Sequence, residues 1–179
     1  MITIEVLKKD SPTVCALAAL LIDTVANGGS VSFMHPLAPE LARSFWEDSL
    51  AAAERRERVV LGAFDGELLV GTTTLLYMWM PNQPHRAELA KMMTRMSHRG
   101  QGIARALVRV AEQTAIDNGR TLLTLDTAAE DGGAEFYEKL GFLRAGAIPD
   151  YALKPLGGFT ATIFYYKRIG ENKIDSGRI

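Results

Sequence analysis

Apolar and polar positions along the chain alternate with two different periods, which predict strands and helices in a mixed order. Residues 1–7 (MITIEVL) alternate with period two, as expected of a half-buried strand. Ser11 is expected to be the N-cap of a helix with Pro12 at its first position, and that helix is expected to run to about Ala26. A second helix should follow the proline-containing loop at 30–39. The later elements are expected to be strands at 59–64, 68–80 and 86–95, a helix at 103–118, a strand at 121–126, a helix at 133–140, and strands at 142–148 and 159–168.

This order predicts an α/β protein (mixed α+β) with one central mixed sheet of about seven strands and about four flanking helices. Asp65-Gly66-Glu67 separates two strands as a hairpin turn. The 179 residues fit one domain, and no repeat, low-complexity tract or linker divides them. We therefore expect a single domain over residues 1–170 and a polar tail at 171–179.

Charge and hydropathy limit the partners of the protein. Lysine plus arginine (20) nearly balances aspartate plus glutamate (21), so no global basic field favours nucleic acid or an anionic membrane. No apolar run approaches the ~20 residues of a membrane span, and residues 1–10 lack the pattern of a signal peptide. A cytoplasmic protein is expected, and any bound anion must be held by a local arrangement.

The residue types that bind metals are sparse. Cys15 is the only cysteine, which excludes an internal disulfide and a cysteine-based zinc site. Its apolar neighbours predict a small buried hydrophobe. His35, His85 and His98 are scattered over predicted turns, where surface roles are expected. No metal site is predicted.

One glycine-rich turn carries the clearest chemistry. Arg99-Gly100-Gln101-Gly102-Ile103-Ala104 follows a strand and opens a helix, where free backbone N–H groups and the helix dipole favour an anion. Gly100 and Gly102 let a phosphate approach the backbone closely, and Arg99 and Arg105 add cationic donors. No P-loop motif is present, and Arg105 occupies the third glycine position of the dinucleotide fingerprint. A diphosphate site is predicted.

Arg99-x-x-Gly102-x-Ala104 resembles the Q/R-x-x-G-x-G/A motif of the GNAT acetyltransferase superfamily, and residues 134–142 (AEFYEKLGF) resemble its F-Y-x-K-x-G-F segment. The order of elements agrees along nearly the whole chain. The resemblance implies an enzyme that transfers an acetyl group from acetyl-CoA to an amine by direct attack in a ternary complex. The segments at 28–34, 86–88, 125–127 and 161–165 further resemble tabtoxin-resistance acetyltransferases, which implies a small toxin, antibiotic or amino-acid-like acceptor.

The resemblance also implies which residues hold the cofactor. Residues 92–94 would offer backbone groups to the pantetheine arm, as a neighbouring strand would. Two positions depart from the common pattern: Met96 replaces a proline, and Glu130 stands where an asparagine often touches the cofactor, which weakens a cofactor contact there. The implied cofactor-binding residues are Met92, Met93, Thr94, Arg99, Gly100, Gln101, Gly102, Ile103, Ala104 and Arg105.

Three side chains are candidates for proton transfer. An ammonium with a pKa near ~10 must lose a proton before it attacks a thioester. By the resemblance, Glu88, alone or with Asp126, would accept that proton, and Tyr137 would protonate the departing thiolate. Other interpretations remain: Glu88 could be a solvent-facing strand residue, Asp126 could form a turn, and Tyr137 could pack in the core with Phe136 and Leu140.

The acceptor pocket is expected at Ser32, Phe33 and Met34, with Glu88 and Asp126 providing negative potential for an amine. The alternatives are a protein or peptide N-acetyltransferase, which needs an open groove there, and an acyl-CoA sensor without catalysis. A homodimer through the last strands is also possible by the resemblance.

Overall fold

The structure is a computed structural model that describes residues 1–130 and 132–170. The predicted tail at 171–179 lies outside the described residues. Over the described chain, the strands form one seven-stranded sheet in the order β1-β2-β3-β4-β5-β7-β6. All neighbours are antiparallel except β4 and β5, which are parallel. The strands are β1 (Ile2–Val6), β2 (Arg58–Asp65), β3 (Leu68–Tyr77), β4 (Arg86–Thr94), β5 (Leu122–Ala128), β6 (Leu143–Leu153) and β7 (Phe159–Arg168).

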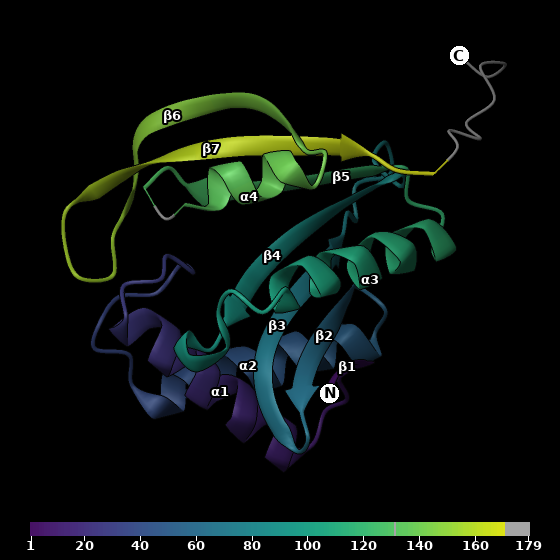
Figure 1. The fold of residues 1–179 in the computed structure, drawn as a ribbon. Coiled ribbons are helices and arrows are strands. Elements are labelled where there is room, and N and C mark those ends of the chain that lie inside the picture. Colours follow the sequence, from purple (N-terminus) through teal and green to yellow (C-terminus); the bar gives the residue numbers. More distant parts are fainter. Residues whose placement is uncertain (131, 171–179) are drawn as a thin grey trace, which may run out of the picture.

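Four α-helices of the described chain cover the two faces of this sheet (Figure 1). Buried side chains of α1 and α2 pack in one apolar cluster with strand residues such as Val60 and Leu69. Those of α3 and α4 pack in a second cluster that includes Leu123 and Leu125. The predicted fold class is therefore confirmed. The helices are α1 (Ser11–Ala26), α2 (Pro39–Glu54), α3 (Ile103–Asp117) and α4 (Gly133–Lys139), with a short 3-10 helix η1 (Met96–His98) before α3.

The first helix corrects two details of the sequence prediction. Its N-cap is Asp10 rather than Ser11, and the Asp10 carboxylate accepts a 2.7 Å hydrogen bond from the Thr13 backbone N–H. A proline is tolerated one position later because the first-turn N–H groups have no intrahelical partner. Cys15 is exposed, so the expectation of a buried thiol was wrong. Apolar neighbours in sequence did not reveal the buried stripe, because Val14 and Leu17 turn inward while Cys15 lies on the outer face.

β6 extends beyond its predicted end at Ile148. The strand continues past Pro149 to Leu153, with register shifts between Arg144 and Gly146 and between Ile148 and Ala152. A proline lacks the N–H that a central strand needs, but β6 is the edge of the sheet, where that loss is tolerated. The predicted end of the strand at Ile148 was wrong because the place of a strand in the sheet decides whether a proline interrupts it.

The parallel pair at the centre of the sheet positions the site. β4 and β5 pair only at Arg86–Leu122, Ala87–Leu123 and Glu88–Thr124, although both strands continue further. Beyond these pairs they diverge into a wedge (Figure 1). β4 also contains an extra residue relative to β3, and Lys91 in this bulge has φ +53°. The backbone edge of β4 that faces the wedge therefore lacks a neighbouring strand.

No helix of the described residues is long and apolar enough to span a membrane.

Candidate active site

The glycine turn adopts a backbone that requires glycine at two positions. Gly100 has φ +76° and Gly102 has φ +80°, and Gly102 is the N-cap of α3. L-residues rarely adopt this region. A Cβ at either position would meet no atom within 4 Å, so the space beside the turn is open. Together with the unpaired N–H groups of the first helical turn, this backbone forms an anion cradle, flanked by Arg99 and Arg105.

A cavity of about 970 Å³ fills the wedge and reaches the glycine turn. Its wall includes residues 92–94 of β4, Thr127 of β5 and the end of α1 with its following loop, Asn27 to Val31. Of the predicted cofactor residues, Gln101 alone is missing from the wall, and its amide donates to the Ser97 carbonyl at 3.3 Å. The predicted cofactor residues that line the cavity are Met92, Met93, Thr94, Arg99, Gly100, Gly102, Ile103, Ala104 and Arg105.

The wedge explains why these positions lie together. A residue in a central strand normally forms hydrogen bonds to both neighbours, but β4 has a partner only on its β3 side beyond Glu88. An extended chain of about one strand's width can therefore bind beside β4 and complete its hydrogen bonds. The cavity continues from this edge to the anion cradle, so one elongated ligand with a diphosphate could occupy both.

Tyr137 packs in the core and also lines the cavity, so both interpretations considered from the sequence remain open. Its ring packs edge-on against Phe136 and Phe142, at centroid distances of 5.0 and 5.7 Å, and is 7% exposed. It also lines the cavity. Burial, and then the negative charge of Asp126, raises the pKa of Tyr137 to about 12. The phenol is therefore protonated at neutral pH and is able to donate a hydrogen bond or a proton into the cavity.

Glu88 and Asp126 come together on the other face of β4 and β5. Glu88 pairs in register with Thr124, and Asp126 lies two residues further along the same strand. Leu123 and Leu125 point into the buried core, so the side chains of Thr124 and Asp126 point to the opposite face. Neither carboxylate lines the cofactor cavity. They lie beside it, since Thr127, next to Asp126, is part of its wall.

The two carboxylates interact and are both partly desolvated. Burial, and then the charge of Asp126, raises the pKa of Glu88, while Arg86 and Lys91 oppose the rise. Burial likewise raises the pKa of Asp126, against the attraction of Lys91. Arg86 Nη1 is 3.8 Å from Glu88 Oε2. A carboxylate with a raised pKa is a better proton acceptor than one with its ordinary value.

Lys91, a residue that sequence reasoning missed, links the predicted acceptor loop to the neighbourhood of these carboxylates. The Lys91 ammonium donates to the Ser32 hydroxyl at 3.0 Å. Phe33 stacks edge-on against Phe45 at 5.1 Å, and Met34 is 44% exposed. The available signal was a single cation between the apolar Leu89-Ala90 and Met92-Met93, which sequence analysis did not follow up.

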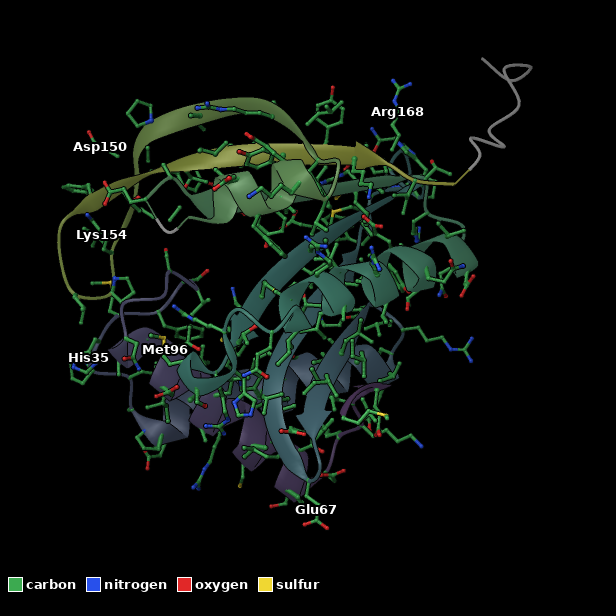
Figure 2. The ribbon with its side chains drawn as sticks, in the orientation of Figure 1. His35, Glu67, Met96, Asp150, Lys154 and Arg168 are labelled. Atoms are coloured by element: carbon green, nitrogen blue, oxygen red, sulfur yellow. The ribbon has the colours of Figure 1, made fainter. Side chains whose placement is uncertain are left out.

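The turn between β6 and β7 lies against the loop after α1. The His35 backbone N–H donates to the Pro155 carbonyl at 3.0 Å, which ties this turn to the loop after α1. Figure 2 shows Lys154 in the turn, above the loop that bears His35. Lys154 Nζ lies 2.5 Å from Glu130 Oε2, and Glu130 lines the cavity. Glu130 is thus neutralised by a neighbour at the cavity rim.

Metal ligation finds no support in the described residues, where no three His, Cys, Asp or Glu side chains are grouped to hold an ion.

Comparison with known proteins agrees with this geometry. The sequence profile of the Acetyltransferase (GNAT) family matches residues 25–142. The rat (Rattus norvegicus) protein N-acetyltransferase 8B is 37% identical over 86 residues, which are 47% of this chain and 39% of that relative. The chain thus spans about two fifths of the length of this curated relative.

Solved structures share the fold at low sequence identity. A candidate acetyltransferase from Salmonella typhimurium, determined with its cofactor acetyl-CoA, has a TM-score of 0.79 and 14% identity, and covers 99% of both chains. A candidate phosphinothricin N-acetyltransferase has a TM-score of 0.77 and 19% identity, and covers 96% of this chain and all of that one.

Proposed function

The chain belongs to the Acetyltransferase (GNAT) family, and on this premise we propose that it transfers the acetyl group of acetyl-CoA to the amine of a small molecule. One observation carries the proposal. A single cavity joins the anion cradle to Tyr137, and two coupled carboxylates lie beside it on the face open to a second substrate. Under the proposal, the diphosphate would bind at the cradle, the thioester near Tyr137, and the amine near the two carboxylates.

The cavity wall offers hydrogen-bonding and charged groups that could hold the successive parts of acetyl-CoA. Its diphosphate would be held by the N–H groups of the glycine turn and by Arg99 and Arg105. Its pantetheine arm would lie along residues 92–94, whose free edge accepts an extended amide chain. The related fold solved with acetyl-CoA supports the choice of this cofactor.

Replacing both Arg99 and Arg105 by alanine is expected to raise KM for acetyl-CoA by about tenfold, because two charge-assisted hydrogen bonds are lost at an exposed site. The effect should weaken as salt concentration rises. S-acetylpantetheine, which has no diphosphate, should be used equally well by the variant and the parent protein. Arg109→Ala, an exposed arginine on the same helix outside the cavity wall, is the matched control. An equal loss with both acyl donors would contradict the assignment.

The chemistry follows from the positions of the groups. A carboxylate of the Glu88–Asp126 pair takes a proton from the ammonium, directly or through water, which frees the nitrogen lone pair. The nitrogen attacks the thioester carbonyl carbon, and the carbon–sulfur bond breaks as the carbon–nitrogen bond forms. Tyr137 gives its proton to the departing sulfur, and the nitrogen loses its second proton to solvent. A covalent acyl-enzyme on a thiol is not expected, because Cys15, the single cysteine, lies on the outer face of α1 and not in the cavity wall. The amine therefore attacks acetyl-CoA directly.

A panel of amines tests the proposal, with release of free CoA as the measurement. The panel contains tabtoxinine-β-lactam, basic antibiotics, free amino acids and short peptides. Turnover with small amines supports the proposal and the likeness to tabtoxin-resistance acetyltransferases. Turnover with peptides alone favours a protein N-acetyltransferase, and binding of acetyl-CoA without turnover favours a sensor. The cytoplasmic location, the homodimer and the domain bounds at 1–170 stay predictions.

A further inference from the structure

Lys91 has an unusual backbone and unusual surroundings for a lysine. It occupies the β4 bulge at φ +53°, a region that L-residues rarely adopt. Strained positions of this kind are kept where the surrounding structure fixes them, frequently at binding sites. Its ammonium donates to the Ser32 hydroxyl at 3.0 Å and lies 5.7 Å from the centre of the Phe45 ring. The side chain therefore reaches from the strand toward the acceptor loop.

Lys91 has charged neighbours, but its direct partners among the described residues are neutral. It interacts with two carboxylates, Glu88 on β4 and Asp126 on β5, and with a second cation, Arg58 on β2. Among the described residues, no carboxylate lies within 4.0 Å of its ammonium, and its direct partners are a hydroxyl and a ring. Burial, the largest effect, lowers the pKa of Lys91. A partly buried cation with neutral partners gains from an anion.

Of the other two cations of this face, Arg86 has several acceptors, while the buried Nε–H of Arg58 has none among the described residues. Arg86 donates to the Gln83 side chain at 2.7 and 3.0 Å, and to the Thr124 hydroxyl at 3.1 Å. Arg58 donates to the Ser49 hydroxyl at 3.2 Å. Three cations, Arg86, Arg58 and Lys91, thus lie around the two carboxylates Glu88 and Asp126, and Arg58 also interacts with Glu57. A ligand that brings only positive charge gives the Lys91 ammonium no anionic partner, whereas a ligand with a carboxylate does.

We propose that Lys91 binds a carboxylate of the acceptor, so that the preferred substrates are amines that also carry an acid group, as amino-acid-like molecules do. The inference rests on the proposed function and names its substrate class. The ammonium of such a molecule faces Glu88 and Asp126 while its carboxylate faces Lys91. Both charges of the ligand then meet opposite charges, and the ligand is held in one orientation. Polyamines and aminoglycosides have no group for Lys91.

A comparison of matched substrates tests this assignment. The substrates are pairs that differ only in the acid group: 4-aminobutanoate with 4-aminobutanamide, and free L-amino acids with their carboxamides. The enzymes are the parent protein, Lys91→Met, Lys91→Arg and Lys8→Met, where Lys8 is an exposed lysine outside the site. For each pair and enzyme, the ratio of kcat/KM for acid over amide is measured. Differences in intrinsic amine reactivity cancel when ratios are compared between enzymes.

The parent ratio is expected to fall by about tenfold or more in Lys91→Met, as a charge-assisted contact is lost. Lys91→Arg should keep most of the preference and Lys8→Met all of it. The acid limb of the pH profile should also move to higher pH in Lys91→Met, because the lysine no longer lowers the pKa of Glu88 and Asp126. A ratio that does not change in Lys91→Met overturns the proposal, as does a parent preference for the amides.

Failure of the proposed function is a different result. If no amine of either kind is acetylated, calorimetric titration of 4-aminobutanoate and 4-aminobutanamide into the CoA-saturated protein decides the question. Tighter binding of the acid, lost in Lys91→Met, supports the carboxylate site without catalysis. Equal binding of both compounds, or an acid preference that Lys91→Met retains, refutes it.

Discussion

The double variant Glu88→Gln/Asp126→Asn is expected to lose about 10³-fold in kcat, within the range that a positioned general base contributes. Both side chains keep their size and shape, so the loss reports on proton transfer. Each single variant should lose less activity than the double variant, because the remaining carboxylate lies on the same face and can still accept a proton. The measurement is steady-state release of CoA at several pH values.

Stability should change in the opposite direction. Burial raises the pKa of both carboxyl groups above their ordinary values. Such a carboxyl group ionises more readily in the unfolded chain than in the folded protein. Its ionised form therefore lowers the folding stability at neutral pH, and this loss disappears once the pH falls below the pKa values of both the folded and the unfolded state. The neutral amides remove this loss, and the double variant should melt at a slightly higher temperature than the parent at neutral pH, but not at acidic pH.

The control for the carboxylates is Glu67→Gln, an exposed turn residue that Figure 2 places at the far end of the molecule from Lys154. It should change neither kcat nor the acid limb of the pH profile. In the parent, activity should fall at acidic pH because ionised carboxylates are needed. The midpoint of that fall should lie above the ordinary pKa of a glutamate, because burial raises the pKa of both groups. If the double variant kept full turnover over the whole pH range, the base would have to be sought elsewhere.

Tyr137→Phe is expected to lower kcat by about 10²-fold, because the thiolate then leaves without a proton donor. KM for acetyl-CoA should stay nearly constant, since the ring that lines the cavity is retained. With the pKa of Tyr137 at about 12, the parent should show no loss of phenol protonation up to about pH 10. The melting temperature separates this role from core packing, because phenylalanine preserves the contacts with Phe136 and Phe142.

Tyr151→Phe is the matched control for Tyr137, because Tyr151 is an exposed tyrosine on β6 that packs edge-on against Phe164. It should leave kcat unchanged. Unchanged turnover in Tyr137→Phe would remove the acid role and leave only the packing role. Lower turnover together with a large loss of melting temperature would mean that the hydroxyl supports the structure.

Local signals in the sequence predicted most of the elements, because their causes are local. The glycine turn at 99–105 is one case: two positive φ angles and a helix start require the residues that stand there. Gly119 is another: it follows the C-cap residue of α3 with φ +74°, a conformation that glycine adopts readily. The helix predicted at 133–140 is also present, as α4 (Gly133–Lys139).

What the sequence could not predict depends on partners far apart along the chain. The length of β6 follows from its edge position, which no local pattern encodes. The wedge exists because β4 and β5 share only three residue pairs, although both strands are longer. The bulge at Lys91 changes which way that side chain points, and an alternating pattern does not show it. Lys91 therefore joined the candidate site only when the structure placed it beside Ser32.

The unpaired edge of β4 also bears on how readily this protein can acquire new substrates. Under the proposed function, the strand holds the cofactor through backbone groups, which every residue except proline provides. Its side chains at Glu88 and Lys91 face the acceptor. Substitutions at these side chains can change the choice of acceptor while the cofactor contacts persist. Under the proposed function, a change of acceptor specificity therefore needs few mutations. A proline in residues 89–94 would instead disturb both cofactor binding and the choice of acceptor, because it removes a backbone N–H and alters the strand that bears the acceptor-facing side chains.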